Sequence, residues 1–391
     1  RHAFGLHLYE SGADLFSIKE AMGHKSLSST ELYLVLGIGN GRSVKSPYDF
    51  GDYPIRDAFK RFYPAYLKRH PELLEEKRRT AASIMCCKTG GLGYNISFCE
   101  DCGFPLIHAV SCNNRSCPCC QAPLEKKWEL ERNTELIEGI AYFHVVFTIP
   151  HDLGPLIKAN LKVLLDLQFK CVQETLLTLC PDPKFLGAKP GIISILHTWG
   201  QKLTFHPHIH VTYQEFEDPS RFQAFIDHLF RKHWLPFVKE TFNGRGNAIR
   251  YLAQYSFRTA IANSRISEIT DTHVTFRYKD YADGGKEKHL TVKGTDFIGM
   301  FLQHVLPKGF NRVRFSGYLT NCKKTKNLKL IHRLRNTVYP GNPYRGMKVA
   351  KLMMSLYGKD ICTCPECSGR MVRLPRGMPA SGLPSQLRIN L

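Results

Sequence analysis

Phe205-His-Pro-His-Ile-His-Val-Thr212 has, from His208 onward, the polar and apolar alternation of a β-strand. Side chains at positions i and i+2 of a strand project from the same face. We therefore expect His208 and His210 to lie side by side and to hold one cation through their imidazoles, while Ile209 points into the core. The preceding segment, Gly191–Trp199, also reads as a strand, and the turn near residues 200–202 predicts a hairpin.

Two tyrosines, Tyr251 and Tyr255, follow the histidine pair in a segment with a helical pattern. A spacing of i and i+4 places their hydroxyls one turn apart on one face of a helix, and Arg258 shares that side. Paired tyrosines also occur in amphipathic cores, but these two lie nearly opposite the apolar side of their helix. That apolar side consists of Ile249, Leu252, Ala253, Phe257 and Ala260. Tyrosine hydroxyls can attack phosphodiesters, so a tyrosine pair beside a metal predicts DNA strand breakage.

Four segments of the chain together carry a family resemblance. They are Tyr142–Pro150, His197–Gln201, the helix with the two tyrosines, and Leu306–Phe310. With the histidine pair, they resemble the rolling-circle transposases of the insertion sequence 91 family, which are two-tyrosine HUH endonucleases. The resemblance runs from about residue 50 to about residue 335. It implies an α+β fold in which an antiparallel sheet with flanking helices carries the metal and a helix brings the tyrosines over it.

The resemblance also implies the chemistry of the site. His208 and His210 would hold Mg²⁺ or Mn²⁺ with a third protein ligand. Gln201 is the expected third ligand because the hairpin folds it back beside His208, and His206 and His197 are the alternatives. Imidazole binds zinc as well, so the identity of the cation stays open. One tyrosine would form a 5′-phosphotyrosine on single-stranded DNA and release a 3′-hydroxyl, and the other would permit a second transfer.

The composition favours a polyanionic partner. The chain carries 54 lysines and arginines against 34 acidic residues, a formal charge of +20 on 391 residues. The phosphate backbone of DNA is the expected counter-charge, although basic composition alone is compatible with RNA. We find no bilayer-length apolar run and no signal peptide, so we expect a soluble cytoplasmic protein associated with the nucleoid. Because no ATPase phosphate-binding motif is present, we expect host helicase or replication machinery to separate the strands.

The cysteines cluster in close pairs, which argues for metal thiolates rather than a disulfide framework. Two CxxC knuckles stand at an interval that predicts a tetrahedral zinc ribbon, in which the metal stabilises a short segment. The expected zinc ligands are Cys99, Cys102, Cys117 and Cys120. The family resemblance further implies that Cys87 and Cys112 are zinc ligands.

Another knuckle, Cys362-Thr-Cys364-Pro-Glu-Cys367, lies near the C-terminus. Alone it is half of a ribbon, so a zinc site here requires partners from elsewhere in the fold or from another chain. Without such partners, these cysteines are ordinary thiols. The spacing alone does not decide between a zinc site and ordinary thiols.

The first residues carry a second resemblance. Arg1, His24 and Tyr33 stand in the order of the second catalytic arginine, the histidine and the nucleophile of tyrosine recombinases. The upstream arginine, lysine hairpin and DNA-clamping domain of such enzymes are missing, so we expect residues 1–38 to be an inactive remnant. A first residue other than Met leads us to expect a truncated or fused reading frame.

The sequence therefore predicts five segments. They are a recombinase remnant (1–38), a linker (39–49), a helical and zinc-binding transposase domain (50–140), a two-tyrosine catalytic domain (141–335) and a C-terminal tail (336–391). Within the catalytic domain we expect helices over 156–179 and 222–241 and a late hairpin around Asp283-Gly-Gly. Three functions compete: a two-tyrosine transposase, a zinc-dependent DNA-binding protein with an inactive centre, and a tyrosine site-specific recombinase. The number of matching motifs favours the transposase.

Overall fold

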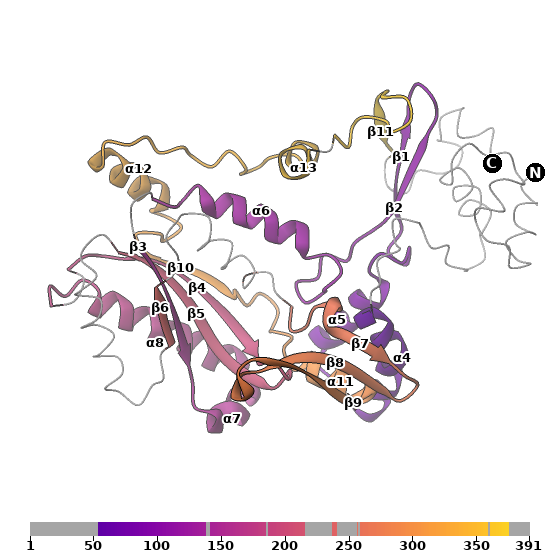
Figure 1. Cartoon of the computed structure of the whole chain (residues 1–391), viewed down its shortest axis with the longest axis horizontal. Helices are drawn as coiled ribbons and strands as arrows, with labels where there is room; N and C mark the ends of the chain where they lie inside the picture. Colours follow the sequence, from indigo (N-terminus) through magenta and orange to yellow (C-terminus); the bar gives the residue numbers. More distant parts are fainter. Residues whose placement is uncertain are drawn as a thin grey trace, which may run out of the picture. The chain divides into compact units, whose positions relative to one another are not determined.

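The computed structural model describes residues 54–137, 141–184, 187–215, 237–240, 256, 259–358 and 360–374. Within these ranges the chain forms two compact units (Figure 1). The first contains residues 54–56, 82–120 and 347–374, and the second contains residues 57–81 and 121–346. Residues from 347 onward, expected as part of a separate tail, thus belong to the same unit as residues 82–120.

The second unit is built on an antiparallel sheet of five described strands in the order β10-β4-β5-β3-β6. The strands are β3 (Ala141–Thr148), β4 (Gly191–Trp199), β5 (Phe205–Glu215), β6 (Phe237–Glu240) and β10 (Val313–Gly317). The predicted hairpin of Gly191–Trp199 with the histidine strand is β4 and β5, which pair along most of their length. The α+β class with an antiparallel sheet is therefore confirmed.

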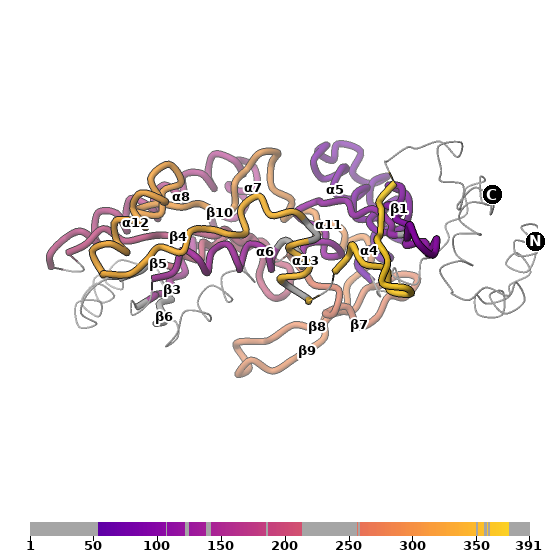
Figure 2. Tube along the Cα trace, turned by 90° about the horizontal axis from the view of Figure 1, so that it is seen from above, coloured from indigo at the N-terminus to yellow at the C-terminus, as the bar shows by residue number. Residues whose placement is uncertain are grey.

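Helices cover both faces of this sheet. On one face Ile209 packs with residues of α8 (Leu161–Leu179), such as Phe169 and Val172, in a fully apolar cluster. On the other face Ile193 and Ile195 of β4 pack with residues of α6 (Ala122–Asn133) and α12 (Lys324–Leu334). The two helix layers can be followed in Figures 1 and 2. Because Ile209 faces α8, the flanking histidines of β5 face the opposite side, as the alternation predicted.

Two of the predicted helices differ from the elements that the structure contains. The helix expected over 156–179 is two helices, α7 (Gly154–Ala159) and α8, separated at Asn160, whose φ and ψ of −132° and 43° are not helical. The helix expected over 222–241 is wrong at its end, because residues 237–240 form β6 and pair with β3. Phe237 and Val238 suit a strand, and β3 offers an open edge for pairing. Residues 222–236 and 241 lie outside the described residues.

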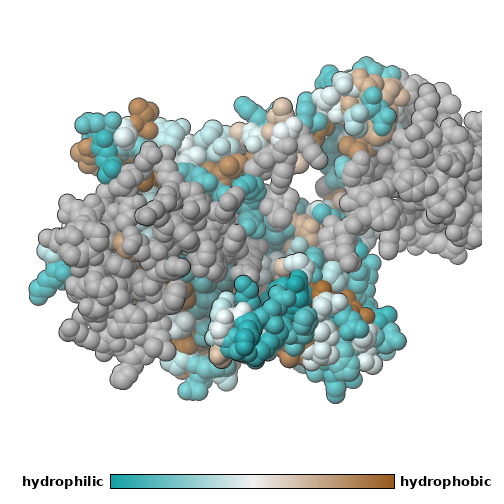
Figure 3. Space-filling model, in the orientation of Figure 1, coloured by the Kyte–Doolittle hydropathy of each residue, from teal (hydrophilic) through white to brown (hydrophobic). Residues whose placement is uncertain are grey.

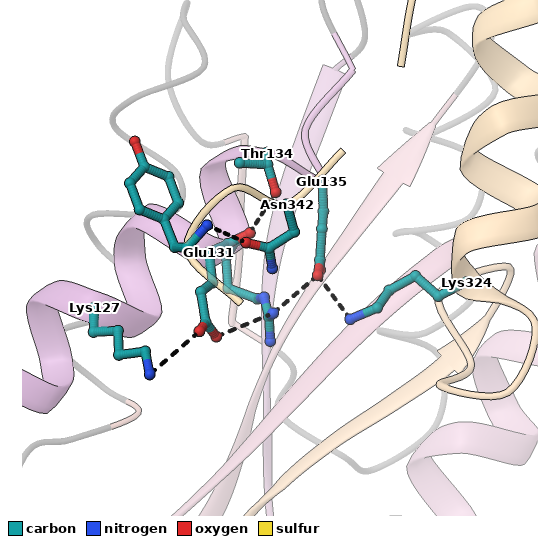
Figure 4. Close-up of polar contacts among 8 residues, drawn as sticks. Lys127, Glu131, Thr134, Glu135, Lys324 and Asn342 are labelled. Atoms are coloured by element: carbon teal, nitrogen blue, oxygen red, sulfur yellow. Dashed lines mark hydrogen bonds and ion pairs between the residues drawn. The ribbon is translucent and has the colours of Figure 1, made fainter. Parts of the chain in front are cut away.

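A buried ion-pair network joins α6 to α12 in the second unit (Figure 4). The Glu135 carboxylate lies 2.9 Å from an Arg132 guanidinium nitrogen and 2.7 Å from Lys324 Nζ. Glu135 is buried, and burial lowers the pKa of Lys324, assisted by the nearby charge of Arg132. Lys324 belongs to a basic run, but its charge is directed into this network.

A separate antiparallel sheet, β7-β8-β9, also belongs to the second unit. It contains β7 (Ile266–Ile269), β8 (His273–Asp280) and β9 (Lys286–Lys293). The predicted late hairpin is confirmed, with Gly284 and Gly285 at φ values of 60° and 80° in the turn. The surface of this hairpin is hydrophilic (Figure 3).

The apolar side of that sheet packs on helices. Phe276 of β8 contacts Phe297 of α11 (Gly294–Leu302) with ring centroids 6.1 Å apart. Phe301 of the same helix packs edge-on against Phe59 of α4 (Pro54–Arg69) at 5.1 Å. α4 is followed by α5 (Glu75–Cys86).

The first unit contains a small antiparallel sheet in the order β11-β1-β2. β1 (Tyr94–Cys99) pairs with β2 (Pro105–Ala109) on one side and with β11 (Met371–Arg373) on the other. A short helix, α13 (Val349–Tyr357), precedes β11 along the chain. None of the helices described here is long and apolar enough to cross a membrane.

Candidate active site and metal centres

Three histidines converge on one face of the central sheet. His197 of β4 is the cross-strand partner of His208 of β5, and His210 lies two residues further along β5. One ligand nitrogen from each of the three lies within 4.8 Å of the others. Three imidazoles at this spacing are a suitable ligand set for a divalent transition metal.

The hydrogen bond of His208 fixes its protonation form. Its Nδ1 lies 2.7 Å from the carbonyl oxygen of His206. Since a carbonyl only accepts, Nδ1–H donates and the lone pair is left on Nε2. Burial lowers the pKa of His208 to about 4, although the bond to the His206 carbonyl opposes this shift. The imidazole is therefore neutral at pH 7, which is the form that binds metals.

A fourth histidine, which the sequence analysis missed, supports the triad from β3. His144 Nε2 lies 2.9 Å from His210 Nδ1, and the two rings stack at 5.2 Å between centroids. Burial, followed by the neighbouring His208, lowers the pKa of His144 to about 4, so it too is neutral. If His210 Nδ1–H donates to His144, then His210 Nε2 carries the lone pair that a metal needs. The only sequence signal was its place in the run Tyr142–Pro150, which carries part of the family resemblance.

Trp199 positions the histidine of β4. Its ring stacks on His197 with centroids 4.4 Å apart and an interplanar angle of 21°. The two residues share a face because they are two positions apart on the same strand. Stacking restricts the rotation of the His197 ring, so the ligand nitrogen is held toward β5.

Gln201, the expected third ligand, takes other partners. Its amide nitrogen donates to the Tyr281 hydroxyl at 3.4 Å, and its amide oxygen accepts from the Lys279 backbone at 3.5 Å. The backbone carbonyl of Gln201 accepts from Arg265 at 2.5 Å. The set of mutually close histidine ligand atoms contains the alternative His197, while the ligand role of Gln201 itself stays a prediction.

His206 is the other alternative ligand. Its backbone carbonyl accepts the hydrogen bond from His208 Nδ1–H. Burial lowers its pKa, and the nearby His151 adds to this shift. His206 lines the same cavity as the triad but is absent from the close ligand set.

The triad opens into a cavity of about 510 Å³. Its walls are the β4–β5 hairpin, the end of β8, and Arg265 and Tyr281 from short helical turns beside that sheet. The described residues that line it are His197, Trp199, Gly200, Gln201, Lys202, Thr204, His206, His208, His210, Arg265, Tyr278, Lys279 and Tyr281. Cationic and aromatic side chains are present, and no carboxylate is found among these described residues. Such a lining suits a polyanion that carries flat rings.

The expected nucleophiles lie outside the described residues. This applies to Tyr251, Tyr255 and Arg258, and likewise to the recombinase-like Arg1, His24 and Tyr33. Of the segment that carries the first three, Ser256 is described as helical and buried. Its carbonyl accepts a hydrogen bond from the Arg312 guanidinium. The carbonyl of Arg312 in turn accepts from the backbone N–H of Leu196, the neighbour of His197, at 2.9 Å.

The predicted zinc cysteines of the first unit fall into separate clusters. The first cluster consists of Cys87, Cys112, Cys117 and Cys120, whose sulfurs lie within 4.8 Å of one another. Cys112 Sγ and Cys120 Sγ are 3.8 Å apart. Hydrogen bonds from Cys112 and the other thiols of this cluster lower the pKa of Cys87 strongly, so the cluster favours a thiolate.

Cys99 and Cys102 do not join that cluster, although both CxxC knuckles were expected in one ribbon. Their sulfurs instead form a second close set with those of Cys364 and Cys367. The physical reason is strand pairing, because β11 adds to the edge of β1 and brings the C-terminal knuckle beside Cys99. The structure thus supplies the partners that the C-terminal half-ribbon required.

Two known families match parts of the chain. A family described as "Transposase zinc-binding domain" matches residues 58–149. A second family, described as "Putative transposase", matches residues 191–215 and 211–326. The second match contains the three histidines of the candidate site.

Curated relatives extend the similarity along the chain. The chain is 31% identical to "Putative transposase y4qJ" of Sinorhizobium fredii, covering 82% of this chain and 94% of the relative. It is 24% identical to the transposase for insertion sequence element IS801 of Pseudomonas savastanoi pv. phaseolicola, covering 79% and 86%. A stretch of 56 residues is 48% identical to tyrosine recombinase XerC of Rickettsia canadensis, covering 14% of this chain and 17% of that protein. No solved structure matches the chain.

Proposed function

Because the chain belongs to the insertion sequence 91 family of transposases, we propose that it nicks and rejoins single-stranded DNA by tyrosine attack on a metal-bound phosphodiester. The observation that carries this proposal is the convergence of His197, His208 and His210 at a cavity lined by cations. Such an arrangement gives a phosphate both a metal and counter-charges.

The three histidines would hold the catalytic cation, either Mg²⁺ or Mn²⁺. Three nitrogen donors suit a transition metal better than Mg²⁺, so Mn²⁺ is the better fit of the two. When bound, the cation polarises the phosphate and stabilises charge on the leaving oxygen. His144 keeps His210 in the ligand form, and Trp199 holds the His197 ring in place.

Tyr251 and Tyr255 are the proposed nucleophiles, with Arg258 beside them. One tyrosine oxygen forms a bond to phosphorus while the bond from phosphorus to the 3′ oxygen breaks. The tyrosine proton leaves to solvent, and the released 3′ oxygen is protonated. The 5′-phosphotyrosine retains the bond energy for rejoining, and the other tyrosine permits a second transfer.

The described neighbours of the tyrosines support this assignment. Ser256 adjoins Tyr255 in sequence, and its carbonyl is bonded to Arg312. The Arg312 backbone is bonded to Leu196, which adjoins His197. These contacts link Ser256 through Arg312 to β4, the strand that carries His197.

The cavity favours single-stranded DNA as the substrate. Lys202, Lys279 and Arg265 would contact phosphates, and Trp199 and Tyr281 would contact bases. Tyr281 is 73% exposed, which leaves its ring accessible to a base. Bases are accessible for stacking only when the strands are separated, so host helicase or replication machinery in the bacterial cytoplasm is the proposed source of the substrate.

The zinc ions are proposed to be structural. The cluster of Cys87, Cys112, Cys117 and Cys120 lies within the matched zinc-binding domain and has the four cysteine sulfurs that a closed zinc site needs. The convergence of three histidines favours an active centre over the reading as a DNA-binding protein with an inactive centre. The recombinase reading rests on a short stretch, and Tyr33→Phe should leave nicking unchanged.

Nicking of a labelled oligonucleotide that carries the element end tests the proposal. With Mn²⁺ present, the protein should cleave the single strand and leave the duplex largely intact. His208→Ala should abolish cleavage, whereas His289→Ala, which alters an exposed histidine on β9, should not. Cleavage that survives in His208→Ala and in chelator would contradict the proposal.

A further inference from the structure

The C-terminal knuckle lies outside the matched zinc-binding domain, which ends at residue 149. Its sulfurs nevertheless approach those of the β1–β2 hairpin. Cys99 Sγ lies 3.5 Å from Cys367 Sγ, and Cys102 Sγ lies 3.7 Å from Cys364 Sγ. Sulfurs bound tetrahedrally to zinc at about 2.3 Å stand about 3.8 Å apart. The spacing therefore fits one zinc ion among the four thiolates.

The two knuckles have the same backbone geometry. The N–H of Cys99 donates to the Phe104 carbonyl at 2.9 Å, and the N–H of Gly103 donates to the Cys99 carbonyl at 3.0 Å. The second knuckle repeats both bonds. The N–H of Cys364 donates to the Gly369 carbonyl at 2.7 Å, and the N–H of Ser368 donates to the Cys364 carbonyl at 3.0 Å.

The turns of the knuckles agree as well. Gly103 and Ser368 occupy the same position in each and have φ values of 71° and 61°. A left-handed conformation is unfavourable for serine, so the surrounding structure must stabilise it. Backbone N–H groups of Glu366 and Gly369 point at Cys364 Sγ and Cys367 Sγ, both at 3.4 Å. Hydrogen bonds of this kind stabilise the charged form of a thiolate ligand.

The apolar contacts around these cysteines are too few to hold the segment alone. Cys99 and Cys364 are buried with Phe104 and Met371 in a cluster of only four buried residues. β11 has three residues and pairs with one edge of β1. A core of this size rarely supports a fold without a metal or disulfides.

We propose that Cys99, Cys102, Cys364 and Cys367 bind a second structural zinc ion, which closes a zinc ribbon between the β1–β2 hairpin and the C-terminal segment. The zinc ion would thus connect two parts of the first unit that lie far apart in sequence. Residues 360–374 are thereby a folded part of the zinc-binding unit. The site is independent of the proposed nicking reaction, because it contains none of the three histidines.

Thiol footprinting of the unaltered full-length protein tests this directly. Cys102, Cys367 and Cys362 are all exposed, and only the first two belong to the cluster. In zinc-replete protein, N-ethylmaleimide should modify Cys362 at least about tenfold faster than Cys102 and Cys367, and chelator should remove the difference. Equal rates in the zinc-replete protein would overturn the proposal.

Metal counting on variants provides the second readout. With the histidine site removed by His208→Ala, the protein should contain two zinc ions per chain by elemental mass spectrometry, and the further change of Cys364→Ser with Cys367→Ser should leave one. Cys362→Ser is the matched control and should keep two. Two zinc ions in the double variant, or iron in place of zinc, would contradict the assignment. If the double variant does not fold, the single change Cys364→His should retain two, because imidazole can replace a thiolate.

Discussion

His197 on β4 and His208 on β5 are direct cross-strand partners, so the third imidazole of the candidate metal centre comes from the neighbouring strand. The turn residue Gln201 is hydrogen-bonded to Lys279 at the end of β8 and to Tyr281 and Arg265, which adjoin the same sheet. If His197 binds the metal and Gln201 only connects the hairpin to its neighbours, then substituting the two residues should affect metal binding differently.

His197→Ala should remove a ligand and strongly weaken Mn²⁺ binding, because two imidazoles hold a divalent cation poorly. Gln201→Ala should leave Mn²⁺ affinity nearly unchanged, since its amide takes other partners. Isothermal titration with Mn²⁺, after zinc loading of the cysteine sites, measures both. If Gln201→Ala loses binding and His197→Ala retains it, the glutamine is the third ligand after all.

His144→Ala should lower Mn²⁺ affinity by about 10- to 100-fold, the usual cost of losing a group that orients a metal ligand. The physical reason is the 2.9 Å contact between His144 Nε2 and His210 Nδ1, which would hold His210 in its ligand form. Manganese titration followed by electron paramagnetic resonance measures the change. His144→Gln should recover part of the affinity by accepting from His210, and an unchanged affinity in His144→Ala would remove its orienting role.

The pH dependence of stability should reveal the buried His304. Its Nε2–H donates to the Leu203 carbonyl at 3.2 Å, and its Nδ1 lies 3.1 Å from the Thr198 hydroxyl. Burial is the main cause that lowers its pKa to about 3, below the unfolded value near 6.5. Between these values the unfolded chain binds a proton that the folded chain does not, so stability falls as pH drops from about 6.5 toward 3.

The size of that loss is at most about 5 kcal/mol for His304. Urea unfolding at several pH values measures it. His304→Gln should flatten this part of the profile because it has no proton to gain. An equally steep profile in His304→Gln would assign the pH dependence to other groups.

Glu135→Ala should destabilise the protein by about 3–5 kcal/mol, because it leaves the buried charges of Arg132 and Lys324 without their carboxylate. Glu131→Ala, which alters a more exposed neighbour in the same helix segment (Figure 4), should cost less than about 1 kcal/mol. Chemical denaturation measures the free energy of unfolding of both variants. Equal effects would mean that the network contributes only as surface charge.

The parts of the fold predicted from sequence are those with a local signal. Alternating residues predicted β4 and β5, and Asp283-Gly-Gly predicted the β8–β9 turn. β6 was missed because an edge strand of four residues depends on pairing with β3, which a periodic pattern does not contain.

For the candidate site, the sequence predicted only the relation between residues of the same strand. His208 and His210 share a strand, so their geometry follows from the period of two. The place of His197 depends on the register between strands, which shifts between His197 and Trp199. The sulfur pairs of Cys99 with Cys367 and of Cys102 with Cys364 span most of the chain, a separation over which spacing rules carry no information.

The central claim is that a tyrosine of this chain attacks a phosphodiester beside the histidine triad, and covalent capture of DNA tests it most directly. A single strand that carries the element end, labelled at its 3′ end, is incubated with Mn²⁺, and the adduct is mapped by peptide mass spectrometry. The account predicts a 5′-phosphotyrosine at Tyr251 or Tyr255, partial capture in each Tyr→Phe variant, and none in the double variant or in His208→Ala. Capture that persists in the double variant, or that maps to Tyr33, would contradict the account.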